Sequence, residues 1–386
     1  MNGRRLTCGL AAVLMAVGVY AQEQRIDATF LYSSSNAAHF GEYSDLSDEG
    51  ARVVGAVDLF GSLDWVSGDN GYWTLRGSNL GLDTYDVELS AGEQGRYGLN
   101  LRFDGISQFK RDDGRTPYSG GGELLALPGS WTPGTTTVDM DLSKANTRSF
   151  DQELQRDRIE LQGHYLFGEH WQAEVSVSHE EKDGDRVAGG AIYFDASTAF
   201  AALLPAPVDY DTSDFSAMAR YSADRLQANF SLLYSDFNND NQRLTWDNAY
   251  SGIGNPAVEY PSGQGSLGTT PDHNRYQLRS SGSWLPPMEL LNGLNLQWDG
   301  AWDKVEQDDN FEPYTVNPDL LVLEGLPRTD LDAEVETTSV DIRANYRPRW
   351  QPLRKLRLRG AYHYDDRDYD CLLYTSDAAD ESSRGW

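Results

Sequence analysis

Apolar and polar side chains alternate along this chain with a period of two residues. In the stretch TYDVELSAGEQGRYGLNLRFD at 84–104, Tyr85, Val87 and Leu89 occupy odd positions, and the pattern resumes after AGEQG with Tyr97. Successive side chains of a β-strand point to opposite faces, so the stretch predicts a hairpin with one apolar and one polar face. A soluble sandwich would bury the apolar face, whereas a membrane barrel would turn it to lipid.

The alternation recurs often enough to predict a protein built almost entirely of strands. Thirteen segments show it, most of them about ten residues long, which suits a tilted membrane-spanning strand. They lie at 26–32, 53–59, 72–80, 84–91, 97–103, 159–167, 171–177, 215–221, 226–234, 276–284, 294–302, 340–346 and 356–364.

The connections between these segments favour the membrane barrel. From residue 159 onward, short connections at 168–170, 222–225, 285–292 and 347–352 alternate with long ones at 180–212, 236–273 and 303–335. Outer-membrane barrels have short periplasmic turns and long extracellular loops, and they carry aromatic girdles at both interfaces. Aromatic residues do cluster at the predicted strand ends, namely Trp171, Tyr221, Tyr234, Trp284, Trp302, Tyr346 and Tyr364.

The opposite face of the predicted strands is polar and carries both signs of charge. One segment presents Arg158, Glu160, Gln162 and His164, and another presents Lys355, Arg357, Arg359 and His363. Burying such charges in a small closed core would carry a heavy desolvation cost, which a wide lumen avoids. The sequence therefore predicts an all-β fold, an antiparallel transmembrane outer-membrane β-barrel that is incomplete, with about 13 strands present in an open sheet with long extracellular loops.

The N-terminus predicts export from the cytoplasm. Residues 1–21 combine a basic start at Arg4 and Arg5, an apolar run from Leu10 to Val19, and small residues before an expected cleavage site at Gln22. This is the three-part pattern of a secretory signal peptide, and the run is too short for a membrane-spanning helix. The bacterial outer membrane is the predicted location.

Composition narrows the class of partner and of chemistry. The formal net charge is −28, which argues against nucleic acid because phosphates would be repelled. Cys8 and Cys371 are the only cysteines, so neither a disulfide framework nor a thiolate metal cage is expected. The motif C-x-x-C-H is absent, so the chain itself cannot attach a c-type haem.

Candidate catalytic and metal-binding motifs are weak throughout. The six histidines, which are His39, His164, His170, His179, His273 and His363, lack metal-ligand spacing. The segment SDFNNDN at 235–241 starts like a calcium loop but lacks the glycine and the closing glutamate. Gly120 to Gly122 follow no strand-to-helix pattern, so a phosphate loop is not supported. No catalytic, cofactor-binding or metal residue is predicted, and the protein is not expected to be an enzyme.

Several segments resemble the MtrB/PioB family of decahaem-associated outer-membrane proteins. They are FGEYSDLSDEG at 40–50, YWTLRGSNLGLDTYDVELSAGEQGRYGLNLRFDGI at 72–106, YSGGGELLALPGSWTP at 118–133 and FDQELQRDRIELQGHYLF at 150–167. The resemblance implies a very wide barrel that sheathes a periplasmic multihaem cytochrome while contributing no redox chemistry itself. Some members carry a C-x-x-C near the mature N-terminus, and this chain has no cysteine there.

The leading hypothesis is thus an outer-membrane sheath that holds and insulates a multihaem c-type cytochrome for electron transfer across the membrane. The haem would belong to the partner in the lumen, outer-membrane lipid would surround the barrel, and an extracellular multihaem cytochrome is a second conceivable partner. The alternative is a wide porin that passes solutes without a cytochrome. A secreted soluble β-rich adhesin and a membrane enzyme are more distant readings.

The end of the chain predicts a separate region. CLLYTSDAADESSRGW at 371–386 breaks the alternation and resembles a translated sequencing adapter, the alternative being a genuine acidic tail. Thirteen strands that start in the periplasm end outside the cell, whereas single-chain bacterial barrels have an even number. We therefore expect a signal peptide at 1–21, the N-terminal part of a barrel at 22–370 with two free edges, and an artefactual or disordered tail at 371–386.

Overall fold

The computed structural model describes residues 24–34, 41–62, 70–193, 199–251, 263–316, 325–326, 328–348 and 353–370. The predicted signal peptide and the predicted tail at 371–386 lie outside the described residues, and so does His39. Among the described residues, no helix is long and apolar enough to cross a membrane.

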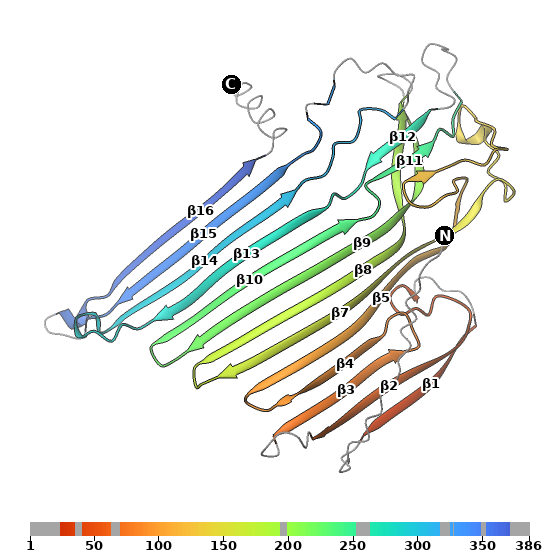
Figure 1. Cartoon of the computed structure of the whole chain (residues 1–386). Helices are drawn as coiled ribbons and strands as arrows, with labels where there is room; N and C mark the ends of the chain where they lie inside the picture. Colours follow the sequence, from red (N-terminus) through yellow and green to blue (C-terminus); the bar gives the residue numbers. More distant parts are fainter. Residues whose placement is uncertain are drawn as a thin grey trace.

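One antiparallel sheet of thirteen strands makes up most of the molecule (Figure 1). Its strand order is β1-β2-β3-β4-β5-β7-β8-β9-β10-β13-β14-β15-β16. Each strand of this sheet therefore pairs with the strands of the sheet that come before and after it in the sequence. The bounds are β1 Arg25–Ser33, β2 Gly50–Ser62, β3 Gly71–Leu80, β4 Asp86–Glu93, β5 Tyr97–Thr116, β7 Arg148–Phe167, β8 Trp171–Tyr193, β9 Ala199–Ser222, β10 Leu226–Asn239, β13 His273–Trp284, β14 Leu294–Gln307, β15 Ala333–Tyr346 and β16 Leu358–Asp370.

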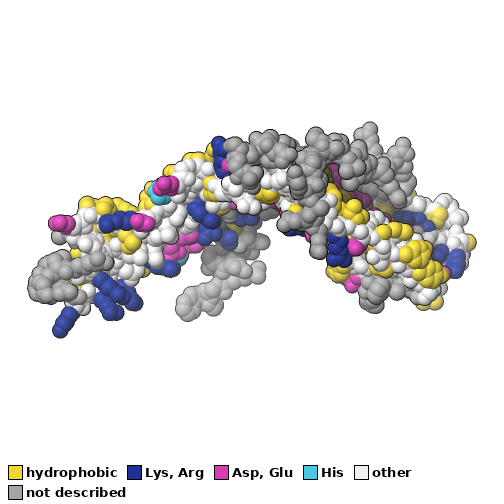
Figure 2. All heavy atoms as spheres, turned by 90° about the horizontal axis from the view of Figure 1, so that it is seen from below, with side chains coloured by type: hydrophobic (Ala, Val, Ile, Leu, Met, Phe, Trp, Pro, Cys, Tyr) yellow, Lys and Arg dark blue, Asp and Glu magenta, His cyan; other side chains and the backbone are white. Residues whose placement is uncertain are grey.

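This sheet confirms the predicted strands, because each of the thirteen segments overlaps one of them. The last strand begins slightly later than expected, since Leu356 follows the short 3-10 helix Leu353–Lys355 and its N–H donates to the carbonyl of Leu353 at 2.8 Å. The sheet curves into an arch (Figure 2). Within the described part of the chain β1 pairs only with β2 and β16 only with β15, so the predicted open sheet with two free edges is confirmed.

The predicted strand lengths and long loops need correction. β7, β8 and β9 have 20, 23 and 24 residues, so the expected loop at 180–212 is mostly a continuation of the β8–β9 ladder. The ladder runs without interruption from the pair Trp171 and Tyr221 to the pair Tyr193 and Ala199. Beyond the lipid neither face has to be apolar, so the alternation fades there while backbone hydrogen bonds continue the strands.

A small second sheet is formed by two of the connections between the predicted strands. It has the order β12-β11-β6, with β6 Leu124–Leu125, β11 Arg243–Asp247 and β12 Gln264–Gly268. The segment 235–241, considered above as a loop, belongs to β10 up to Asn239, so the connection that was expected from residue 236 starts later. Figure 1 shows β11 and β12 near the end of the large sheet where its long connections lie.

We call this small sheet and the loops around it the cap. It encloses a compact apolar core made of Tyr118, Leu125, Leu204, Ala206, Leu244, Trp246, Ala249 and Tyr250. Leu204 and Ala206 come from the extended part of β9, and Ala188 and Ile192 of β8 pack against the same core. The cap is therefore anchored on the β8–β9 extension, beyond the segment that the sequence predicted to cross the membrane.

Candidate functional site

The outer face of the sheet carries large apolar side chains that no other part of the described structure covers. Leu99 is 55 % exposed, Leu278 53 % and Val177 49 %, and each lies among apolar neighbours on adjacent strands. A soluble monomer rarely exposes so large a continuous apolar surface, whereas contact with lipid requires one. Figure 2 shows hydrophobic side chains along the outer edge of the arch on its left limb.

Aromatic side chains border this apolar band on both sides. Near the short turns, Trp171 and Tyr221 pack with ring centroids 4.9 Å apart. Toward the long connections, Tyr234 and Tyr276 lie 5.1 Å apart. Two aromatic rows with aliphatic residues between them match the girdles of an outer-membrane barrel.

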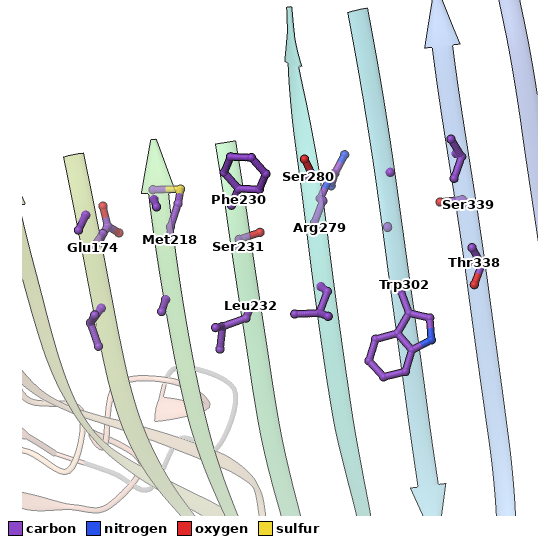
Figure 3. A pocket seen from close by; sticks show the side chains of 18 residues that line it. Glu174, Met218, Phe230, Ser231, Leu232, Arg279, Ser280, Trp302, Thr338 and Ser339 are labelled. Carbon is purple, nitrogen blue, oxygen red and sulfur yellow. The ribbon is translucent and has the colours of Figure 1, made fainter. Parts of the chain in front are cut away.

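A hollow of about 740 Å³ interrupts the outer face between β8 and β15. Its lining includes the small residues Ala217 and Gly300. Leu232 of β10 and Trp302 of β14 project beside it (Figure 3). The charged Glu174 and Arg279 also border the hollow, but each lies one residue away from an outward-facing position on its strand. Their side chains therefore belong to the opposite, inner face. On the outer face the lining is mostly apolar and includes the hydroxyl residues Ser280 and Thr338, so the hollow offers packing space mainly for apolar groups.

The inner face is a wall of polar side chains that pair with one another within and across strands. On β7 and β8, Arg158 lies 3.2 Å from Glu160, the hydroxyl of Ser176 donates to Glu160 at 2.9 Å, and Gln162 donates to Glu174 at 2.8 Å. The sequence prediction that Arg158, Glu160, Gln162 and His164 share one polar face is therefore confirmed by their alternate positions on β7.

The same arrangement recurs along the sheet. On β13 and β14, Arg275 lies 2.6 Å from Asp303, and Arg279 lies 3.0 Å from Asp299. On β4 and β5, Arg102 lies 2.6 Å from Asp86. Because cations and carboxylates of the wall neutralise each other, the inner face presents a wet, locally balanced surface and no strong field of one sign.

The cap lies on the side of the inner face. Glu174 and Ser176 near the start of β8 point to the inner face, and Ala188 lies an even number of residues further along the same strand. Because the β8–β9 ladder has no bulge, Ala188 points to that face as well, and so do Leu204, which pairs with it, and Ala206. The cap therefore lies on the inner side of the β8–β9 extension, at the end of the sheet where the long connections are. Burial raises the pKa of Tyr118 in this core, and its hydroxyl donates to the carbonyl of Asp247 at 3.2 Å.

An acidic cleft of about 480 Å³ lies at the loop ends of β10, β13, β14 and β15. Asp236, Asp272, Asp309 and Glu306 line it together with His273. Burial raises the pKa of Asp272, although its carboxylate accepts the N–H of Asn239 at 2.7 Å. Asp236 belongs to the segment 235–241 that the sequence analysis considered as a calcium loop, whereas the other acidic residues of the cleft were not singled out there.

The histidines lie in separate places. His164 belongs to the inner wall, and His363 on β16 lies 3.3 Å from Asp341 across the strand pair. His170 sits in the short turn before β8, with its ring 5.7 Å from that of Tyr221. His179 lies with Glu181 and Asp211, the one group of three ligand-type side chains found within the described ranges. Sequence reasoning missed this group because Asp211 joins it only through strand pairing.

These observations define the class of protein. The sheet is antiparallel, with an apolar outer face, aromatic girdles, a polar inner wall and long connections at one end. This combination is characteristic of outer-membrane β-barrel proteins. The chain belongs to the MtrB/PioB family. The family model, described as an outer membrane beta-barrel porin, MtrB/PioB, matches residues 32–384. The resemblance noted in the sequence is confirmed, as are the fold class and the outer-membrane location.

A curated relative is similar over most of this chain. It is the outer membrane protein MtrB of Shewanella baltica (strain OS185), which is 27 % identical over 331 residues, or 83 % of this chain. The alignment covers 44 % of that relative, so the chain spans less than half of its length. Among solved structures, the siderophore receptor PiuA of Acinetobacter baumannii covers 86 % of this chain and 48 % of its own, with a TM-score of 0.36 and 11 % identity.

Proposed function

We propose that the chain forms part of a wide outer-membrane barrel that sheathes and insulates a multihaem c-type cytochrome, so that electrons cross the membrane. In this proposal the haem belongs to the partner, and the barrel supplies no redox cofactor and no catalytic residue. A periplasmic cytochrome would occupy the lumen, and an extracellular one could meet it on the side of the cap.

The observation that carries this proposal is the number of strands. Within the described residues, thirteen strands leave both edges of the sheet unpaired, while the alignment covers 44 % of the length of the curated relative. At the same density of strands, a protein of that length would have about twice as many, beyond the 22-stranded barrels whose lumen must be plugged. Such a lumen would leak unless another protein filled it.

The inner wall supports a protein filling of this kind. Its cations and carboxylates are already paired, as in Arg279 with Asp299 and Arg102 with Asp86. A partner can therefore lie against the wall without leaving buried charges uncompensated, which would otherwise be costly. A self-paired wall also tolerates water, which is the observation that favours the second candidate, a wide porin.

The test uses the full-length natural protein, tagged and purified in detergent from the outer membrane of its own organism. The sheath predicts that a haem-staining protein co-purifies, and that liposomes containing the complex transfer electrons from an external reductant to an enclosed oxidant. Purified protein that carries no haem and gives a large, steady ion conductance would instead establish the porin.

A matched pair of variants separates the lumen from the lipid face. Ser176 points to the inner wall, and its neighbour Val175 is 43 % exposed on the outer face. Ser176→Trp should reduce the amount of co-purified haem, because a bulky ring enters the space that the partner occupies. Val175→Trp should leave haem recovery unchanged, since lipid accepts a larger apolar side chain. Equal haem recovery from both variants would contradict the sheath.

A further inference from the structure

His179, Glu181 and Asp211 form a compact group on the outer face of the β8–β9 ladder. His179 and Glu181 are two residues apart on β8, so they point the same way, and Asp211 pairs directly with Glu181 on β9. His179 Nε2 lies 3.7 Å from Glu181 Oε1 and 3.9 Å from Asp211 Oδ1. One ligand atom from each of the three residues lies within 4.8 Å of the others.

From this geometry we propose that His179, Glu181 and Asp211 bind a divalent transition-metal ion, with Zn²⁺ as the best match. One imidazole nitrogen and two carboxylate oxygens form a ligand set that Zn²⁺ accepts, with the fourth position open to water. Ligand atoms of a tetrahedral zinc site lie about 3.4 Å apart, given bond lengths near 2.1 Å. The observed Nε2–oxygen separations of 3.7 and 3.9 Å need a small contraction, and the two carboxylate oxygens, which lie within 4.8 Å of each other, would close toward the same value.

The orientation of His179 supports the proposal. Its Nδ1 lies 3.0 Å from the hydroxyl oxygen of Ser213, the residue that pairs with it on β9. When Nδ1–H donates a hydrogen bond to that hydroxyl oxygen, the lone pair of Nε2 is left free and directed at the two carboxylates. Metal-binding histidines are typically held by such a hydrogen bond from their other nitrogen.

The surroundings add attraction for a cation. Asp157 of β7 pairs with Glu181, and Asp236 of β10 pairs with Ser213, so two further carboxylates lie on the same face beside the group. His179 itself pairs with Ile159 at the upper border of the apolar band. The site therefore lies just outside the lipid-facing band, where water and ions reach it. The proposed metal site does not depend on whether the lumen holds a cytochrome or conducts solutes.

Zinc binding to the full-length protein tests the proposal. The protein is purified in detergent, stripped of metal with a chelator, and titrated with Zn²⁺ alone in a calorimeter. His179→Gln and Asp211→Asn should each weaken zinc affinity by at least about tenfold, and Ser213→Ala, which retains all three ligands, by about tenfold. The control His170→Gln, in the turn at the other end of the ladder, should bind zinc like the unaltered protein.

Two readouts decide between a built site and weak binding by the many carboxylates of this acidic chain. X-ray absorption at the zinc edge should show one imidazole nitrogen among the atoms bound to zinc, and His179→Gln should lose it. Ca²⁺, which prefers oxygen ligands, should bind equally to His179→Gln and to the control. Equal zinc affinity in these two variants, or an environment of oxygen alone, would overturn the proposal. If His179→Gln failed to fold, Asp211→Asn and Ser213→Ala would decide it.

Discussion

At the scale of single residues, the large apolar side chains with least access to solvent belong to the core of the cap. Trp246 is 1 % exposed and packs in the cluster with Leu204 and Leu244. Gly190 and Gly265 lie so close to its indole ring that an added Cβ would clash with it. Gly190 belongs to β8 and Gly265 to β12, and neither has a side chain that would displace the ring. Trp246 of β11 therefore packs against both strands and holds β11, β12 and the extension of β8 together.

Trp246→Ala should therefore open the cap without disturbing the membrane part of the sheet. Loss of a buried tryptophan costs about 3–5 kcal/mol, because both the transfer energy and the packing around the cavity are lost. On intact cells that express the full-length protein, external protease should cleave the cap of the variant much faster, while heat-modifiable migration on gels stays unchanged. Leu267→Ala is the control, since Leu267 in β12 is 45 % exposed. Equal cleavage rates in both variants would refute this role of Trp246.

At the scale of an element, each strand separates two solvents. β13 shows this with adjacent residues, because Leu278 is 53 % exposed on the outer face while Arg279 pairs with Asp299 on the inner wall. The two positions differ by one residue in sequence but lie on opposite sides of the sheet. A substitution at each should therefore have a very different cost.

We predict that Leu278→Arg lowers the free energy of unfolding by about 2–4 kcal/mol, since the charge would enter hydrocarbon. Arg279→Gln should change it by less than about 1 kcal/mol, because an ion pair in a wet lumen contributes little. Urea unfolding of the full-length protein in lipid vesicles, followed by tryptophan fluorescence, measures both. The assignment of the two faces would be wrong if Arg279→Gln were the more damaging change.

At the scale of the whole molecule, the free edges dominate. β1 and β16 each have one side without a partner strand within the described residues. In hydrocarbon every unsatisfied backbone N–H and C=O costs several kcal/mol, and in water such an edge pairs with other chains. The two edges of the thirteen-stranded sheet, as the described residues form it, must therefore be paired before the sheet can remain in a membrane.

The 386-residue chain expressed alone should consequently fail to insert stably and should aggregate through β1 and β16. Its migration on gels should not change on heating, whereas that of the full-length natural protein should. A closed, heat-modifiable barrel of residues 22–386 in liposomes would contradict this expectation, and it would favour the porin over the sheath.

Much of this architecture could be predicted from the sequence, because alternation along a strand is a local property. The environment on each side of the sheet selects the residue type at every second position, so Leu99, Leu278 and the Arg158–His164 segment indicate their faces without any knowledge of their neighbours. The same pattern determined the thirteen strands, their antiparallel order and the polar lumen side.

The tertiary structure alone decided what depends on contacts between distant segments. The extensions of β7, β8 and β9 are held by backbone hydrogen bonds, and their sequences do not alternate between apolar and polar residues. The core of the cap brings together Leu125, Leu204 and Trp246, which span more than a hundred residues of sequence. Asp211 reaches His179 only through the register of the β8–β9 ladder. Side-chain alternation is repeated in every strand, whereas register and loop packing arise from pairings that no single segment encodes.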